Sequence, residues 1–151
     1  MQQALDLARH AQSAGEVPVG AVIVRDGAVV GQGWNQNIRL NDPSGHAEII
    51  AMREAGANAG NHRLPGCTLY VTLEPCCMCA GAMIHARIDR LVYGANDPKT
   101  GAAGGCFDIM HDVRHNHAVV AEGGCREAEC AELLKEFFKL KRRGDRSESN
   151  H

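Results

Sequence analysis

The sequence predicts a single α/β domain in which helices cover a partly parallel β-sheet. Apolar, β-branched runs alternate along the chain with segments of helical periodicity, and this alternation is typical of a layered α/β fold. The length of 151 residues is close to the ~150 residues expected of one domain. Hydrophobic residues at 44% and charged residues at 23% exclude a disordered, collagen-like or coiled-coil chain.

The N-terminal part of the chain predicts a helix followed by a β-hairpin. Alanine and leucine residues recur at helical spacing over residues 2–13, and Gly15 ends this helix. The β-branched run VPVGAVIV (17–24) predicts a buried strand. The Asp26-Gly27 pair predicts a tight turn, after which AVVGQGW (28–34) returns antiparallel.

Two helices and a strand are predicted in the middle of the chain. A polar loop over residues 35–45 leads to a helix that begins near His46. The run CTLYVTL (67–73) predicts a third strand. The segment CCMCAGAMIHA (76–86) predicts a second helix, which starts just after Pro75 because proline is well tolerated at a helix start.

The C-terminal part predicts two further strands and a long helix. Residues 88–94 predict the fourth strand, and residues 117–122 predict a short fifth strand. An amphipathic helix is expected from Cys125 to Lys141. The domain is therefore expected to span residues 1–143, and residues 144–151 are expected to form a disordered tail.

Basic residues gather near the C-terminus, although the net charge of the chain is only −2. The cluster is made up of Lys135, Lys139, Lys141, Arg142, Arg143 and Arg146. A solvated helix face is the ordinary explanation of such a cluster, and contact with phosphates is the alternative. Aromatic residues at 4% are too few for a single-strand binder built on stacked bases.

Cysteine use points to a metal or redox site in a reducing compartment. Seven cysteines is an odd number, and the N-terminus MQQALDLARH lacks the features of a signal peptide, so a disulfide framework is not expected. No apolar run approaches the ~20 residues of a membrane span. We expect a cytoplasmic protein without a membrane-spanning segment.

Three residues have the chemistry and spacing of a zinc site. Cys76 and Cys79 lie three residues apart, which places both thiols on one face of a helix's first turn. The helix dipole lowers thiol pKa there and favours the thiolates that a metal needs. His46 supplies a third ligand if the two predicted helix starts face each other. One imidazole and two thiolates suit one zinc ion per chain and leave a fourth position for water.

Glu48 makes this zinc site a candidate catalytic site. Near a helix start its carboxylate can converge on the same space as the ligands, take a proton from water and return it to a leaving group. Two alternatives stay open. A structural zinc would need a fourth ligand, which Cys67, Cys77 or Cys106 could provide. A Cys-x-x-Cys redox pair is the other alternative, although it would not need the histidine or the glutamate.

Longer motifs identify a family. His-Ala-Glu followed by Pro-Cys-x-x-Cys is the signature of zinc nucleoside and nucleobase deaminases. The short signature alone leaves cytidine, guanine and riboflavin-pathway deaminases open. The chain resembles the bacterial tRNA-specific adenosine deaminases from about residue 4 to residue 142, through the segments EVPVGAVIV, GWN, HAEI, TLYVTLEPC, MCAGAMIHARI and DPKTGAAGG.

The resemblance implies a fold and an activity. The implied fold is a cytidine-deaminase-like three-layer α/β/α sandwich around a five-stranded mixed sheet, and the implied enzyme is a homodimer that acts on a tRNA anticodon stem-loop. The reaction is hydrolytic deamination of adenosine to inosine at the wobble position, with Glu48 as the catalytic proton carrier. A free nucleobase or nucleoside deaminase and a non-catalytic RNA-binding module with structural zinc are the alternatives.

The resemblance also implies substrate contacts. Asn35 matches the residue that holds the target nucleoside, and the backbone N–H groups of Ala47 and Cys76 support the purine or the developing charge. Asp97 and Lys99 open the loop beside the RNA cleft. The C-terminal helix, which meets the anticodon stem-loop, carries the remaining predicted contacts: Phe137, Phe138, Lys141 and Arg142.

Two residues depart from the family pattern. Cys77 fills a position where a small or apolar residue is expected, and we expect it to be a buried small hydrophobe. Gly105 stands where serine is expected, which weakens any hydroxyl contact there. His111, His115 and His117 are interpreted as loop histidines, because no cysteine or carboxylate at a convincing spacing completes a second metal site.

Overall fold

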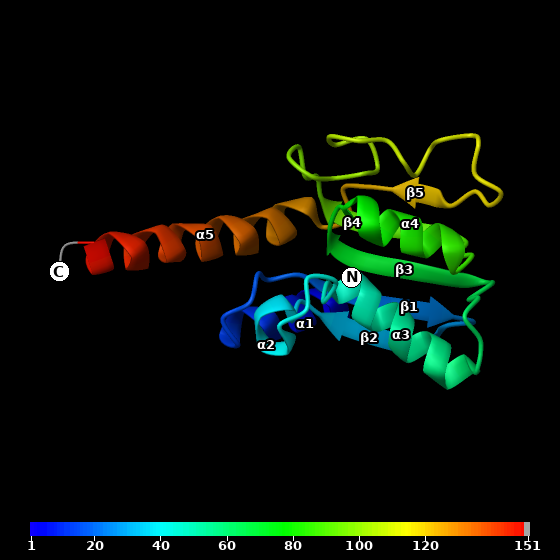
Figure 1. Ribbon diagram of the computed structural model, residues 1–151, viewed down its shortest axis with the longest axis horizontal. Coiled ribbons are helices and arrows are strands. Elements are labelled where there is room, and N and C mark those ends of the chain that lie inside the picture. Colours follow the sequence, from blue (N-terminus) through cyan, green and yellow to red (C-terminus); the bar gives the residue numbers. More distant parts are fainter. Residues whose placement is uncertain (150–151) are drawn as a thin grey trace.

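The computed structural model describes residues 1–149, which form a five-stranded sheet with helices on both faces (Figure 1). The helices are α1 (Gln2–Ser13), α2 (Asn37–Leu40), α3 (Ala47–Ala59), α4 (Cys77–His85) and α5 (Glu127–Ser149). The strands are β1 (Gly20–Arg25), β2 (Ala28–Trp34), β3 (Cys67–Leu73), β4 (Arg90–Ala95) and β5 (Val120–Glu122). The sheet order is β2-β1-β3-β4-β5, in which β1 is antiparallel to both neighbours and β3, β4 and β5 run parallel. The predicted three-layer sandwich with a mixed five-stranded sheet is confirmed.

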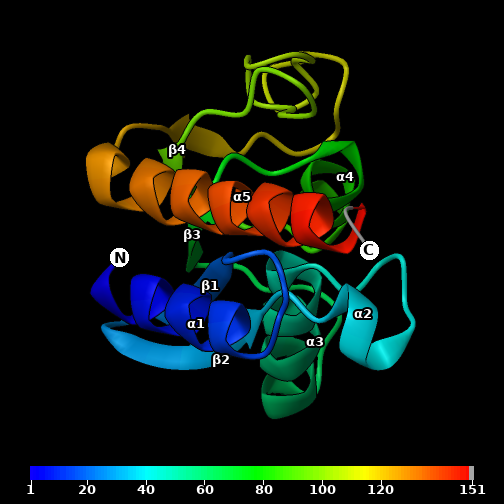
Figure 2. The ribbon, with the colours of Figure 1, turned by 90° about the vertical axis from the view of Figure 1, so that its left-hand side faces the viewer.

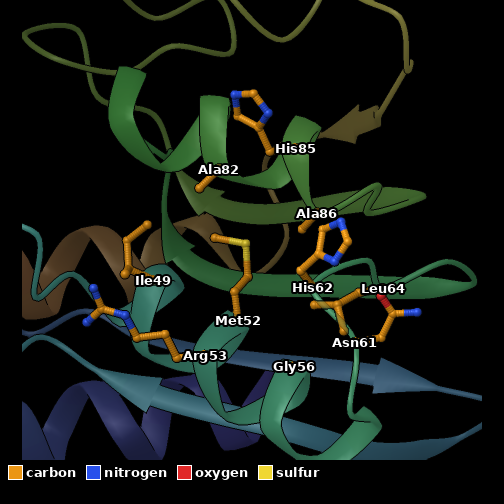
Figure 3. Close-up of a pocket in the computed structure, with 10 residues that line it drawn as sticks. All are labelled: Ile49, Met52, Arg53, Gly56, Asn61, His62, Leu64, Ala82, His85 and Ala86. Atoms are coloured by element: carbon orange, nitrogen blue, oxygen red, sulfur yellow. The ribbon is translucent and has the colours of Figure 1, made fainter.

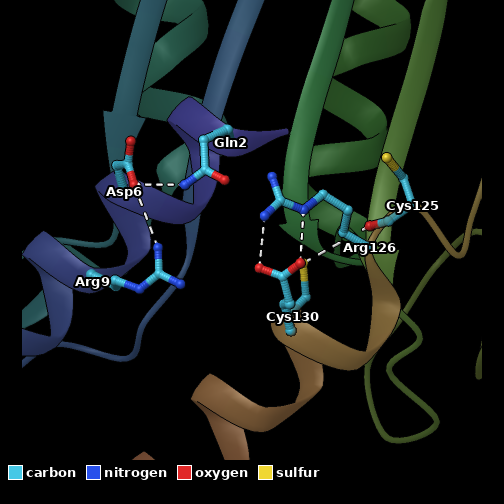
Figure 4. Close-up of polar contacts among 7 residues, drawn as sticks. Gln2, Asp6, Arg9, Cys125, Arg126 and Cys130 are labelled. Atoms are coloured by element: carbon cyan, nitrogen blue, oxygen red, sulfur yellow. Dashed lines mark hydrogen bonds and ion pairs between the residues drawn. The ribbon is translucent and has the colours of Figure 1, made fainter.

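The helices form the two outer layers. Figure 2 shows α1 and the beginning of α5 on one side of the sheet and α3 and α4 on the other. The outer half of α5, residues 138–149, extends past the ends of the strands (Figure 1). Two exposed ion pairs on this side lie within single helical turns, Asp6–Arg9 of α1 and Arg126–Glu129 at the start of α5 (Figure 4). Helices α1 and α5 and strand β4 meet in a small buried apolar cluster of Leu5, Ala95 and Cys130.

Strand β2 and helix α3 approach each other very closely. A Cβ at Gly31 would lie 2.4 Å from the carbonyl oxygen of Ala51, and a Cβ at Gly33 would lie 2.4 Å from that of Ala47. Glycine is therefore required at both strand positions. The facing side of α3 is a stripe of small, fully buried residues at i, i+4 spacing: Ala47, Ala51 and Ala55. This packing fixes the first turn of α3 against the sheet.

Three strands begin later than the sequence predicted. β1 begins at Gly20, three residues late, because Pro18 has no N–H to donate to a neighbouring strand. β4 begins at Arg90, two residues late, because the N–H of Ile88 bonds back to the end of α4. β5 begins at Val120, three residues late. The remaining strand bounds agree with the prediction to within one residue.

Two helical predictions were wrong. The predicted polar loop over 35–45 contains the four-residue helix α2, which lacks the length at which hydrophobic periodicity can be read. The last helix does not end at Lys141, because α5 continues through Gly144 to Ser149 where a disordered tail was expected. One glycine inside a helix costs only ~1 kcal/mol, and the helix-forming residues Arg142 and Arg143 precede this one. Residues 150–151 of the predicted tail lie outside the described residues.

Within residues 1–149, no helix combines the length and the apolar character needed to cross a membrane.

Candidate active site

The starts of α3 and α4 lie next to each other and carry the predicted metal ligands. His46 is the N-cap residue of α3 and Cys76 is the N-cap residue of α4, both with extended backbones at φ −75°. Side chains at such positions project beyond the first helical turn. Cys79 lies in the first turn of α4 and is fully buried. The predicted juxtaposition of two helix starts is therefore present in the structure.

The spacing of the ligand atoms fits one tetrahedral zinc ion. The Nδ1 atom of His46 lies 3.5 Å from the Sγ atom of Cys76 and 3.5 Å from the Sγ atom of Cys79. Zinc at ~2.3 Å from sulfur and ~2.05 Å from nitrogen separates two tetrahedral ligands by about 3.6 Å. The three ligand atoms all lie within 4.8 Å of one another. One side of such an ion remains open.

The alternatives with other cysteines find no support in this geometry. Among residues 1–149, the ligand group consists of His46, Cys76 and Cys79, and no other histidine, cysteine or carboxylate joins it as a fourth ligand. Cys77 is partly buried and packs against the main apolar cluster, as expected of a small hydrophobe. His115 and His117 bond to the carbonyl oxygens of Ile109 and Ile88. A structural zinc with four protein ligands is therefore not favoured.

The thiols are electrostatically prepared for metal binding. The hydrogen bond from Cys79, together with His46, lowers the pKa of Cys76 to about 4. The same shared proton, together with burial, raises the pKa of Cys79. A single proton therefore remains on the thiol pair, and a metal that binds both sulfurs displaces it. The hydrogen bond with Cys76 raises the pKa of His46.

Glu48 lies in the same place but outside the ligand group. Its side chain is only 4% exposed, and burial raises the pKa of its carboxyl group. A raised carboxyl pKa brings the protonated and ionised forms closer in population near neutral pH, which suits a residue that accepts and returns a proton. Glu48 faces a cavity of about 220 Å³ together with His46 and Cys76.

Two of the predicted substrate contacts line this cavity. Asn35 is buried, and its Nδ2 atom donates to Oδ1 of Asn37 at 3.1 Å. Asp97 also lines the cavity. Ala47 is fully buried at the first position of α3 and is not a lining side chain, so any contact there comes from its backbone. Lys99 is exposed outside the cavity, and its N–H donates to Asp97.

Sequence reasoning missed several residues of the cavity. Asn37 and Thr100 line it, and Glu74 lies in its wall. A further missed residue is Glu16, which is buried behind α2. A sequence signal existed for the two glutamates, because each stands beside an apolar strand and a proline, in EVPVG and LEPC.

The predicted contacts of the C-terminal helix fall into two groups. Phe137 and Lys141 line a second groove of about 480 Å³ with Ile38 of α2. This groove shares lining residues with the cavity, among them Asn35. Phe138 is 41% exposed, and its ring meets that of Phe137 edge to face. The last predicted contact, Arg142, is exposed and does not line the groove.

Three metal-ligand side chains with an open side, and a buried glutamate two residues after the histidine, define the centre of a zinc-dependent hydrolytic deaminase. Residues 1–95 match the model of a protein family that is described as the cytidine and deoxycytidylate deaminase zinc-binding region. The chain belongs to this deaminase family.

Relatives of this chain include tRNA-specific adenosine deaminases from two bacteria. The chain is 50% identical to that of Haemophilus influenzae over 143 residues, which is 94% of this chain and 83% of the relative. It is 48% identical to that of Agrobacterium fabrum, over 96% of this chain and 95% of the relative. These relatives confirm the resemblance found in the motifs.

Solved structures agree with this family assignment. A structure from a study of A-to-I editing by tRNA deaminases at the wobble position of transfer RNA matches with a TM-score of 0.86 and 48% identity, over 89% of this chain and 97% of that chain. A guanine deaminase from Nitrosomonas europaea matches with a TM-score of 0.77 and 27% identity, over 90% of this chain and 81% of that chain.

Proposed function

We propose that this protein deaminates adenosine to inosine at the wobble position of a tRNA anticodon. The observation that carries the proposal is the cavity in which His46, Cys76 and Glu48 meet, in a chain that is 50% identical to a tRNA-specific adenosine deaminase. The similarity to deaminases and the geometry of the cavity both support hydrolytic removal of an exocyclic amino group. The proposed product pair is inosine and ammonia.

The roles of the residues follow from their places around the cavity. When bound by His46, Cys76 and Cys79, zinc supplies a Lewis acid with an open position for water. Glu48 holds a proton on its buried carboxyl group and delivers it to the departing amino group. Asn35 holds the nucleoside from one wall with its amide group. The N–H groups at the two helix starts favour negative charge that develops on the purine.

The second groove supports recognition of RNA around the reacting base. It continues from the cavity along α5, where Phe137 offers an aromatic face and Lys141 offers a cation. A wobble base lies in a single-stranded loop, so the enzyme avoids most of the cost of opening a duplex. The exposed cations of the outer half of α5 support contact with the phosphates of the stem.

A substrate panel tests the proposal. An anticodon stem-loop with adenosine at the wobble position, the same stem-loop with cytidine there, free adenosine, free cytidine and free guanine are compared by kcat/KM. We expect efficient turnover of the adenosine stem-loop, weak turnover of free adenosine, and none of the cytidine stem-loop. Because remote contacts orient the reacting base, truncation lowers kcat as well as affinity. Faster turnover of free guanine or cytidine would refute the RNA assignment and leave the hydrolytic chemistry standing.

We also propose that the enzyme is a cytoplasmic homodimer. A groove of about 580 Å³ between α3 and α4 is lined mainly by apolar side chains, among them Ile49, Met52 and Ala82 (Figure 3). An exposed apolar groove on an outer layer offers a surface on which a second copy of the chain can pack. Seven free cysteines, three of them in or beside the metal site, suit a reducing compartment.

Mass measurement in solution tests the homodimer. Ala82→Glu places a charge in the groove, and we expect it to convert a dimer into a monomer with unchanged zinc content. Lys135→Glu on α5 is the matched control and is expected to leave the mass unchanged, because Lys135 does not line the groove. A monomeric wild-type protein at micromolar concentration would refute the homodimer.

A further inference from the structure

Two buried glutamates near the cavity take no part in the chemistry described above. Glu16 and Glu74 are each 2% exposed, and every hydrogen bond that their carboxylates accept comes from a backbone N–H. Buried carboxylates are costly unless their oxygens are well bonded. Both are well bonded, and in each case the donors belong to a segment that also carries cavity-lining residues: α2 with Asn37, and the 97–105 loop with Asp97 and Thr100.

Glu74 holds the 97–105 loop. Its Oε1 atom accepts the N–H of Asp97 at 3.0 Å, and its Oε2 atom accepts those of Ala103 and Gly105 at 2.9 Å each. The carboxylate of Asp97 then accepts the N–H and the hydroxyl of Thr100. Asp97 and Thr100 are the cavity-lining residues of this wall. Their positions therefore depend on Glu74.

The same loop is attached to a metal ligand. The N–H of Ala102 donates to the carbonyl oxygen of Pro75 at 2.8 Å, and Cys76 forms an isolated antiparallel bridge with Gly101. Glu74 directly precedes these two residues in the chain. The 97–105 loop and the metal ligand Cys76 are consequently joined through one short segment, residues 74–76, which follows the end of β3.

The shape of the loop is matched to the carboxylate. A Cβ at Gly101 would lie 2.4 Å from an oxygen of Glu74, and a Cβ at Gly105 would lie 2.4 Å from the other. Glycine at position 105, where the family pattern predicted serine, is therefore explained by close contact with Glu74. Gly101 and Gly105 are thus explained by the buried glutamate, whereas Gly104 is explained by its backbone φ of +109°.

Glu16 holds a second segment of the cavity lining, α2, in the same way. Its Oε1 and Oε2 atoms accept the N–H groups of Ile38 and Arg39, at 2.9 and 3.0 Å, which are in the first turn of α2. The first residue of α2, Asn37, receives the hydrogen bond from Asn35 and itself donates to the carbonyl of Asp42. The Asn35 amide, which lines the cavity, is thus oriented through α2.

We propose that Glu16 and Glu74 are positioning residues, each of which fixes one wall of the active-site cavity through backbone N–H groups. Helix α2 and the 97–105 loop are not strands of the sheet. The two carboxylates therefore accept backbone N–H groups that a neighbouring strand would otherwise bind. Displacement of catalytic groups by about 1 Å can cost ~10²-fold in rate. The identity of the substrate rests on the proposed function, whereas the attachment of the walls does not.

Substitution by glutamine isolates this role. Glutamine has nearly the size of glutamate but has one acceptor oxygen and an NH₂ group, which must face at least one of the N–H donors. Glu74→Gln is expected to accelerate amide hydrogen exchange in residues 97–105 and to leave residues 35–40 unchanged. Glu16→Gln is expected to do the reverse. Each variant is the control for the other, and Glu54→Gln on the exposed side of α3 is expected to change neither segment.

Kinetics and metal content complete the test on the zinc-loaded protein. We expect one zinc per chain in both variants and a fall in kcat of roughly 10- to 100-fold. KM is expected to change little, because the outer half of α5 still binds the RNA. If no RNA is turned over, the kinetic comparison is made with the best substrate of the panel, and the exchange data remain interpretable.

Two outcomes would overturn the proposal. One is unchanged exchange in the wall that the substituted glutamate contacts. The other is faster exchange throughout the chain with a lower melting temperature and an unchanged kcat per folded molecule, which would indicate a contribution to global stability alone.

Discussion

The cavity and the outer half of α5 are built in opposite ways. In the cavity, the ligands and Glu48 are partly or fully buried at helix starts that pack against the sheet. In α5, Cys130 is the buried residue, and every described residue after Phe137 is exposed. Bond-making chemistry needs atoms held in place, whereas contact with phosphates needs charge near a surface and tolerates motion. The two regions should therefore respond differently to substitution.

The largest expected effect comes from loss of a metal ligand. Cys79→Ala leaves two ligand side chains, so we expect loss of both bound zinc and turnover. Cys77→Ser is the matched control, because this neighbouring cysteine lies outside the ligand group. Metal content by mass spectrometry and inosine formation are measured together. Full activity of the zinc-free Cys79→Ala protein would contradict the assignment of this site.

Glu48→Ala is expected to separate chemistry from binding. The substitution removes the proton carrier but no ligand, so zinc content and RNA affinity should be retained while kcat falls by at least ~10²–10⁴-fold. Single-turnover deamination and equilibrium RNA binding are the measurements. Activity near that of the wild type would rule out the proposed role of Glu48.

Neutralisation of the outer half of α5 is expected to act on binding and not on chemistry. Alanine at Lys139, Lys141, Arg142 and Arg143 should flatten the slope of log Kd against log salt by about 3 in total, since each phosphate contact contributes roughly 0.7–0.9. The kcat at saturating RNA should stay unchanged. A control that exchanges lysine and arginine at the same positions keeps the charge and should keep the slope. An unchanged slope in the alanine variant would show that this face is merely solvated.

The smallest effect is expected from the aromatic pair of α5. Phe137 lines the groove beside the cavity, so Phe137→Ala should cost roughly 1–3 kcal/mol of RNA binding if a base stacks there. Phe137→Tyr retains the ring and should bind normally. Phe138→Ala should have a smaller effect, because Phe138 does not line this groove. The outcome against this interpretation is a larger loss of affinity for Phe138→Ala than for Phe137→Ala.

Local spacing made the metal site readable from the sequence. Cys76 and Cys79 belong to one helical turn, and Pro75 marks where that turn begins. His46 begins another helix, and the soft ligand set of one imidazole and two thiolates indicates zinc. The sheet was readable for the same reason, since the β-branched runs and the Asp26-Gly27 turn are local signals.

Tertiary structure alone decided how the walls of the cavity are held. Glu16 bonds to residues 22 and 23 positions away, and Glu74 bonds to residues 23, 29 and 31 positions away. No periodicity or cap pattern reports such pairs, because their donors come together only after the sheet has formed. For the same reason the short helix α2 escaped prediction, since its first turn is capped by the distant Glu16. The sequence by itself determined which groups carry the chemistry, and the fold determined which groups keep them in position.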